Sequence, residues 1–198
     1  MPFTVTIFAT ILLYAWVLEP KGTPVALPGG VLLAATILNN LVSGEWGLSP
    51  RVLPQASRAT ALFTLPAVLA VLAVGLALGT LHDRSDFLGN FAELIPWGAA
   101  QQWMLQTVVL REVRRRLPPR AAIFVAAVLF ALVHTPNVFL MLMTFIGALG
   151  WCAIYSRHRN FLPLAVSHAL ATLALLYAFD DDITGRLRIG ESYLRLRP

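Results

Sequence analysis

The chain has 198 residues, of which 58% are hydrophobic and only 13% are charged, with a formal net charge of +5. A soluble domain carries about 25% charged residues, so there is too little polar surface here to cover a soluble core of this size. The composition therefore excludes a soluble enzyme, a disordered chain and a nucleic-acid-binding domain. The single cysteine excludes a disulfide framework.

Apolar segments follow one another along the chain at residues 3–18, 26–43, 59–81, 91–110, 121–134, 138–155 and 161–179. Most approach the ~20 residues with which a helix crosses the hydrocarbon core of a bilayer. We expect an all-α, polytopic membrane bundle of about seven transmembrane helices. It would form a single membrane domain over residues 1–198, with an extramembrane tail at 180–198. The first segment lacks a basic start and a clear cleavage site, which favours a retained span over a signal peptide.

The arginines select an orientation for these segments. With a cytoplasmic N-terminus, the loops on the other side of the membrane hold only Lys21 and Arg84. The cytoplasmic loops then hold nine arginines, which are Arg51, Arg58, Arg111, Arg114, Arg115, Arg116, Arg120, Arg157 and Arg159. Because positively charged loops stay in the cytoplasm, we expect an integral protein of a bacterial plasma (inner) membrane with its N-terminus inside.

The fifth segment is short for a membrane span. Its 14 residues, Ala121 to His134, cover only ~21 Å as a helix. Pro136 follows directly, and it lacks an amide hydrogen and disfavours helix at the residue before it. A break at membrane depth must be buried in protein or line a wet cavity. Either the segment ends at such a cavity, or the span begins earlier, among the preceding prolines, and crosses normally.

Polar side chains recur in segments that should face lipid. They are Asn39 and Asn40 in the second segment, Glu93, Gln101, Gln102 and Gln106 in the fourth, His134 in the fifth, and Ser167, His168 and Thr172 in the seventh. At a rise of ~1.5 Å per residue, the fourth, fifth and seventh segments bring such groups to the middle of the bilayer. Since polar groups inside a membrane turn inward, we expect an interior cavity shared by Gln101, Gln102, Gln106, His134 and His168.

Two plainer interpretations limit what these residues imply. For Asn39 and Asn40, a hydrogen bond across a helix pair is favoured over a functional role. The histidines could bind zinc, but a third carboxylate or thiolate ligand is missing at their depth, because Cys152 lies near the inner face. We therefore expect no metal and no cofactor. The expected partners are the lipid bilayer and a membrane protein or peptide, and no nucleic acid.

Three short motifs carry a resemblance to a known family. They are Q-Q-x-x-x-Q at 101–106, F-x-x-x-H at 130–134 and H-x-x-x-T at 168–172. In order and spacing they resemble E-E-x-x-x-R, F-x-x-x-H and H-x-x-x-N of the CPBP intramembrane proteases, also called the CAAX-protease and bacteriocin-immunity (Abi) family. The resemblance covers roughly residues 90–178. It implies an endopeptidase without a catalytic metal, in which the first glutamate and the histidines activate water and the final asparagine helps to stabilise the oxyanion.

The chain departs from that pattern where the chemistry takes place. Gln101 and Gln102 replace the two glutamates, Gln106 replaces the arginine, and Thr172 replaces the asparagine, whereas His134 and His168 match. An amide cannot accept a proton as a carboxylate does.

No other carboxylate is well placed to substitute for the lost glutamates. On a regular helix, Glu112 falls on nearly the same face as Gln101 but ~16 Å away, and Glu93 lies ~12 Å away in the other direction. A histidine, whose pKa is near neutral, could serve as the base.

Two function hypotheses stay open at this point. The first is an intramembrane endopeptidase of the CAAX-processing type with an altered, weakened site. Its candidate catalytic residues are His134, His168, Gln101, Gln102, Gln106 and Thr172. The second is an inactive homologue that acts as a membrane binding or regulatory protein. A small transporter is disfavoured, because no inverted repeat or pair of broken spans is visible.

Overall fold

The computed structural model describes residues 1–82 and 87–196, and those residues form helices without a strand. The chain folds as two compact units, each assembled from separated stretches of sequence. The first unit comprises Met1–Trp46, Met104–Leu149 and Leu187–Pro198, and the second comprises Gly47–Trp103 and Gly150–Arg186. The helical content confirms the expected all-α fold.

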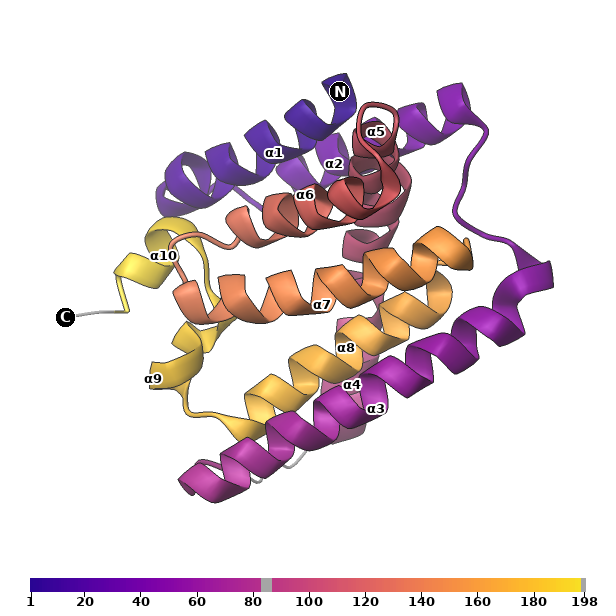
Figure 1. Cartoon of the computed structure of the whole chain (residues 1–198). Helices are drawn as coiled ribbons and strands as arrows, with labels where there is room; N and C mark the ends of the chain where they lie inside the picture. The colour runs from indigo at the N-terminus through magenta and orange to yellow at the C-terminus, as the bar shows by residue number, and fades with distance from the viewer. Residues whose placement is uncertain (83–86, 197–198) are drawn as a thin grey trace. The chain divides into compact units, whose positions relative to one another are not determined.

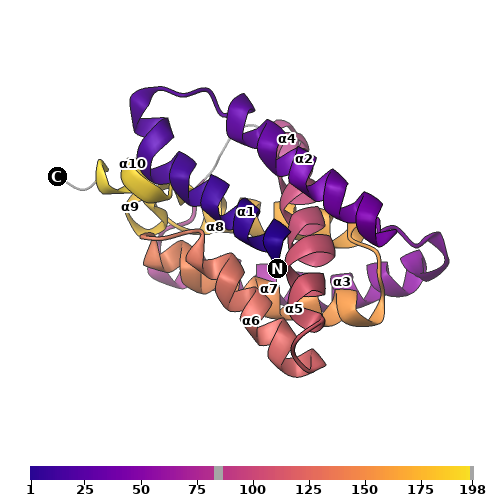
Figure 2. The same ribbon diagram turned by 90° about the horizontal axis from the view of Figure 1, so that it is seen from above.

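The first unit is built around its N-terminal helices. Its elements are α1 (Pro2–Leu13), the π-helix η1 (Tyr14–Leu18), η2 (Glu19–Lys21), α2 (Ala26–Ser43), the π-helix η4 (Leu105–Leu110), α5 (Arg111–Arg114), α6 (Pro119–Leu132), the first part of α7 (Val138–Arg157) and α10 (Gly190–Leu194). Helices α1 and α2 pack side by side (Figures 1 and 2). Ile7, Ala35 and Val108 form a buried apolar cluster that joins both helices to η4.

The second unit is built on two long helices that lie side by side, α3 and α8 (Figure 1). Its elements are η3 (Pro50–Val52), α3 (Leu53–Leu78), α4 (Phe87–Met104) up to Trp103, the end of α7, α8 (Leu162–Ala178), α9 (Asp181–Thr184) and η5 (Gly185–Leu187) up to Arg186. The ends of α3 and α8 are joined, because Thr80 Oγ1 donates to the carbonyl oxygen of Ala178 at 2.6 Å. The His82 amide donates to the carbonyl oxygen of Tyr177 at 2.9 Å.

Prolines set the starts of several apolar helices. Pro54, Pro119 and Pro163 lie in the first turns of α3, α6 and α8. A proline is tolerated there because the first amide groups of a helix have no intrahelical acceptor and the ring fixes a helical φ angle. The fifth expected span therefore begins at Pro119, and α3 begins several residues before the expected 59.

Four helices in the described residues are long and apolar enough to cross a membrane, at Pro2–Lys21, Ala26–Ser43, Pro50–Leu78 and Val138–Arg157. Helices Pro119–Leu132 and Leu162–Ala178 are apolar but shorter. The remaining expected span, 91–110, forms α4 and η4, which carry the glutamines of the first motif. Each of the seven expected segments thus corresponds to a helical stretch.

The fourth expected span is not the regular α-helix that the depth estimates assumed. Residues Leu105–Leu110 form a π-helix between α4 and α5. Asn39 Nδ2 on α2 donates to the carbonyl oxygen of Thr107 within this segment at 2.9 Å, so the wider turn is stabilised by a partner from another helix. The expected alignment of Gln101 and Glu112 on one helix face is therefore wrong, because a π-helix shifts the angular position of every later residue.

Candidate functional site

His168 lies in α8 of the second unit, and Gln102 contacts its Nδ1. Gln102 Nε2 lies 3.2 Å from His168 Nδ1, and the relative exposure of the two residues is 0% and 5%. With the amide nitrogen of Gln102 placed toward the ring, as it is here, Nδ1 of His168 is the acceptor. The proton of the neutral ring is therefore on Nε2, which makes that nitrogen a hydrogen-bond donor.

Trp151 fixes the plane of the His168 ring. The two rings stack with centroids 4.7 Å apart and an interplanar angle of 14°. The indole Nε1 donates to Ser167 Oγ at 2.8 Å, and Ser167 Oγ shares a second hydrogen bond of 2.6 Å with Thr64 Oγ1 on α3. These contacts join α3, the end of α7 and α8 around one imidazole.

The close approach of α4 and α8 depends on Gly98. A Cβ atom added at Gly98 would lie 2.8 Å from the carbonyl oxygen of Ala165 and 3.4 Å from the Cβ of His168. Only glycine leaves room for this contact. It brings Gln102, one turn further along α4, within reach of His168.

The two other motif residues of this unit are less enclosed. Gln101 is half-buried on α4, and its side chain makes no hydrogen bond to any residue that the structure describes. Thr172 is half-buried on α8, one turn after His168. The second unit therefore brings Gln102 and His168 together and places Gln101 and Thr172 on the same two helices.

His134 lies in the first unit, directly after α6. Its Nδ1 is 2.7 Å from the carbonyl oxygen of Phe130, and the two rings make an edge-to-face contact with centroids 5.1 Å apart. Because a carbonyl oxygen only accepts, Nδ1 carries the proton. Nε2 of the neutral ring then has a free electron pair and is suited to accept a proton. The F-x-x-x-H spacing therefore has a direct structural purpose.

In the turn after His134, Thr135 and Pro136 are half-buried. Asn137 is fully buried; its Oδ1 accepts the amide hydrogen of Leu140 at 3.0 Å, and its Nδ2 donates to the carbonyl oxygen of Arg188 at 3.1 Å. The amide of Gly190 donates to the carbonyl oxygen of Thr135 at 2.8 Å. The C-terminal segment thus satisfies the backbone of the turn that carries His134.

Gly190 is required for this docking. Its φ angle is +60°, and an added Cβ atom would clash with the carbonyl oxygen of Ala15 in η1. Glycine adopts a positive φ at little cost and permits the close approach. Sequence reasoning missed this role of the tail, although H-T-P-N and the isolated glycine at 190 were visible signals.

Replacing Asn137 with Ala is expected to destabilise the protein by about 1–3 kcal/mol, because a helix cap and the hydrogen bond to the carbonyl oxygen of Arg188 are lost. Thermal unfolding of the purified protein in detergent, followed by circular dichroism, measures this. Asn137→Asp keeps the acceptor that caps α7 but loses the donor to Arg188, so its stability should lie between those of the native protein and of Asn137→Ala. Equal stability of all three proteins would contradict the assigned contacts.

Gln106 belongs to the π-helix η4 of the first unit, and polar residues of α2 and α5 lie close to this helix. Gln106 is fully buried there. Asn39 Nδ2 also donates to Asn40 Oδ1 at 2.8 Å, and Arg111 Nη1 donates to Asn39 Oδ1 at 3.1 Å. Together with the contact to Thr107, the bond from Arg111 gives Asn39 the interhelical role that was favoured for it, whereas the bond between Asn39 and Asn40 lies within α2.

The nearby carboxylates are not arranged as catalytic bases. Glu112 is buried, and its Oε2 accepts the amide hydrogen of Thr4 at 2.9 Å, in the first turn of α1. A carboxylate is stabilised at this end of a helix by the free amides and the helix dipole. Glu93 is exposed on α4. Glu112 therefore has a structural role in anchoring α1.

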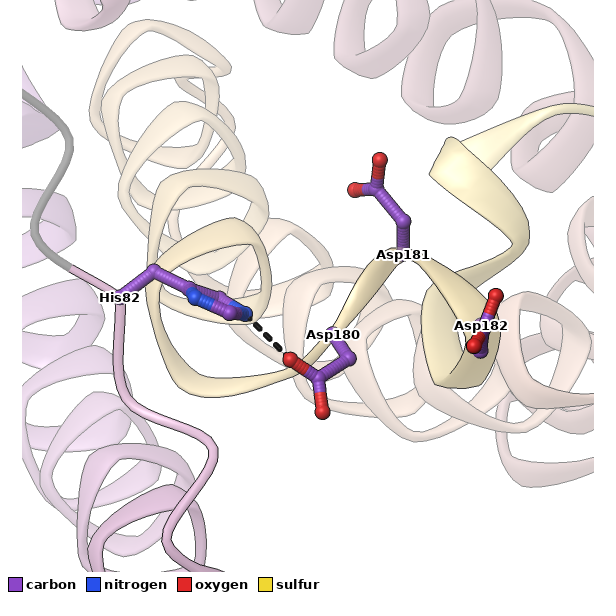
Figure 3. A pocket seen from close by; sticks show the side chains of 4 residues that line it. All are labelled: His82, Asp180, Asp181 and Asp182. Carbon is purple, nitrogen blue, oxygen red and sulfur yellow. Dashed lines mark ion pairs between the residues drawn. The ribbon is translucent and has the colours of Figure 1, made fainter.

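A further cavity of about 370 Å³ is lined by His82, Asp180, Asp181 and Asp182 in the second unit (Figure 3). His82 Nε2 lies 2.6 Å from Asp180 Oδ1, and Asp181 Oδ2 pairs with Arg186 Nε at 3.0 Å. Sequence reasoning missed this cavity, because His82 and the aspartate run lie on separate loops. In the part of the chain that the structure describes, no group of three His, Cys, Asp or Glu side chains is placed to hold a metal ion.

The six motif residues are divided between the units. Gln101, Gln102, His168 and Thr172 belong to the second, and Gln106 and His134 belong to the first. The contact between Gln102 and His168 is observed. A cavity shared by all five residues of the expected set stays a prediction.

Residues 94–174, which contain all six motif residues, match the family model described as type II CAAX prenyl endopeptidase Rce1-like. No curated protein and no solved structure matches the chain significantly. Over residues 94–174 the chain is similar to the type II CAAX prenyl endopeptidases of the Rce1-like family, and this match together with the four long apolar helices indicates an integral membrane protein.

Proposed function

We propose that the protein is a weakened intramembrane endopeptidase of the CAAX-processing type, with a histidine in place of the family's glutamate base. The observation that carries this proposal is the complementary hydrogen bonding of the two histidines. His134 donates from Nδ1 to Phe130, which leaves Nε2 as an acceptor, whereas His168 accepts at Nδ1 from Gln102, which makes Nε2 a donor. One ring is set to take a proton and the other to give a hydrogen bond.

In the proposed reaction each histidine has the role that its own hydrogen bond gives it. His134 Nε2 takes a proton from water, and the resulting hydroxide attacks the carbonyl carbon. His168 Nε2–H stabilises the oxyanion by a hydrogen bond, and this hydrogen bond is stronger in a site of low dielectric than in water. The tetrahedral intermediate then breaks its C–N bond, and the His134 imidazolium returns the proton to the leaving nitrogen. The products are a carboxylate and an amine, and the remaining proton leaves to solvent.

The substrate follows from the membrane setting. A peptide segment that enters the bilayer exposes its amide bonds in a medium without water, where polar partners are scarce. We therefore propose that the substrate is a membrane protein or a membrane-embedded peptide.

Replacing His134 with Ala is expected to lower cleavage by at least about 10²-fold, because a positioned general base contributes about 10²–10⁴ in rate. The assay uses purified protein in liposomes with a library of membrane peptides, read by mass spectrometry. His158→Ala is the matched control, since His158 lies at the end of α7 outside the three motifs. Cleavage that survives substitution of both His134 and His168 would refute the proposed site.

The second candidate function is an inactive homologue that binds a membrane partner. It is favoured by the same contact of Gln102 with His168, since this is a neutral amide–imidazole pair where the family has a carboxylate. Replacing an ion network with neutral hydrogen bonds avoids the cost of buried charge. No cleavage by the native chain, together with a partner retained through purification, would establish this function instead.

We further propose that the N-terminus and the loop after α5 are cytoplasmic and that the segment after Asp180 is outside. The chain has one cysteine, Cys152, which is buried. In a Cys152→Ala background, Arg115→Cys should react with an impermeant thiol reagent only after the membrane is opened. Asp182→Cys should react in intact cells. Labelling of Arg115→Cys in intact cells would reverse the orientation.

A further inference from the structure

Arginines are concentrated in the loop of the first unit that joins α5 to α6. Arg114, Arg115, Arg116 and Arg120 lie within seven residues of sequence, and all but Arg114, which is half-buried, are exposed. We call residues 114–120 the arginine loop. It has a charge of +4 and no acidic residue.

These four side chains are not balanced by the protein. Among the described residues, none of them makes an ion pair or a side-chain hydrogen bond, whereas Arg186 and Arg195 both pair with carboxylates. The nearest acidic residue in sequence, Glu112, is buried and accepts the amide hydrogen of Thr4. The arginine loop therefore presents uncompensated positive charge to its surroundings.

An apolar residue lies in the middle of this charge. Leu117, between Arg116 and Pro118, has 38% of its surface exposed. Helix α6 follows immediately, and Phe124 on its surface is 55% exposed. Arginines beside an exposed leucine and an apolar helix match the boundary between lipid headgroups and acyl chains, where guanidinium groups meet phosphates and apolar side chains enter the hydrocarbon.

We propose that the arginine loop is a binding site for the headgroups of anionic phospholipids. A guanidinium group binds a phosphate through two parallel N–H···O hydrogen bonds, which an ammonium group cannot do. Basic segments next to a membrane helix are attracted to anionic lipids, and the attraction falls within the Debye length. Lipid binding by this loop is independent of peptide cleavage.

The same charge could attract a nucleic acid, but the surroundings favour lipid. Non-specific binding to nucleic acid needs basic residues that follow the phosphates of several nucleotides. The arginine loop is a single short turn, and its centre is the exposed Leu117. The loop also adjoins an apolar helix of an integral membrane protein, so phospholipids are the phosphates available at the highest local concentration.

The test is lipid binding by the full-length protein in detergent, measured by native mass spectrometry with phosphatidylglycerol and with phosphatidylcholine. The native chain should bind phosphatidylglycerol preferentially, and binding should weaken with salt. Each arginine contributes about fivefold to the affinity for an anionic lipid surface. The affinity for phosphatidylglycerol should therefore fall about 100-fold in the triple variant Arg114→Gln, Arg115→Gln, Arg116→Gln.

A matched control removes the same charge elsewhere. The triple variant Arg186→Gln, Arg188→Gln, Arg195→Gln changes three exposed arginines of the C-terminal region and should keep the preference for phosphatidylglycerol. Circular dichroism and gel filtration check that both variants fold. Leu117→Asn should weaken the binding of phosphatidylglycerol and leave the binding of free glycerol phosphate unchanged.

Three outcomes would overturn the proposal. The first is equal binding of both lipids by the native chain. The second is a loss of phosphatidylglycerol binding in the control variant that is as large as the loss in the variant of the arginine loop. The third is binding of glycerol phosphate or of a short duplex DNA that is as tight as binding of phosphatidylglycerol.

Discussion

Replacing Gln101 with Glu is expected to raise peptide cleavage by about 10²–10⁴-fold, the usual contribution of a positioned general base. Gln101 occupies the position of the first motif glutamate and is half-buried on α4. Its side chain makes no hydrogen bond within the described residues, so the substitution breaks no side-chain hydrogen bond there. The measurement is the rate of product formation with the membrane-peptide library in liposomes.

Gln101→Glu alone should lower the stability of the fold, because a lone carboxylate inside the protein lacks a counter-charge. Adding Gln106→Arg and Thr172→Asn restores the family's pattern and should recover stability together with activity. Gln55→Glu, an exposed glutamine near the start of α3, is the control and should leave cleavage unchanged. If the triple variant folds and no combination cleaves faster than the native chain, Gln101 is not at the reacting centre.

The outcome also separates the two candidate functions. A rise from a measurable native rate supports a weakened enzyme with a histidine base. Activity that appears only in variants carrying Glu at position 101 identifies the native chain as an inactive homologue. In that case the neutral contact between Gln102 and His168 serves binding or folding rather than proton transfer.

Much of the fold could be predicted from the sequence, because apolar length and proline positions act locally. The apolar runs correspond to helices, and Pro119 and Pro163 mark the starts of α6 and α8. The π-helix at Leu105–Leu110 could not be predicted, since the partner that stabilises it, Asn39, is contributed by a distant helix. The tail's contact with the turn after His134 was missed for the same reason.

The candidate site was predictable in its residues but not in its supporting contacts. F-x-x-x-H spacing follows from one helical turn, and the structure shows its purpose in the bond from His134 to the carbonyl of Phe130. Trp151 was not singled out, because an aromatic residue in an apolar helix looks like any other core residue. Its stacking on His168 depends on the packing of α7 against α8, which no local pattern encodes.

Replacing Trp151 with Ala is therefore expected to have the largest effect on stability, a loss of about 3–5 kcal/mol. The side chain is 3% exposed, stacks on His168 and donates to Ser167. Trp97→Ala is the matched control, because Trp97 is 57% exposed on α4 of the same unit and should cost little. Unfolding in detergent with increasing denaturant measures both.

Trp151→Phe separates stacking from hydrogen bonding at the same position. The phenyl ring keeps a face against His168 but loses the donor to Ser167, so we expect a loss of about 1–3 kcal/mol, smaller than for Ala. Nitrogen chemical shifts of labelled His168 should then stay those of an Nε2–H tautomer in Trp151→Phe and become averaged in Trp151→Ala, where the ring is free to turn. Unchanged His168 shifts in Trp151→Ala would show that the imidazole keeps its orientation without the tryptophan, which then only fills space.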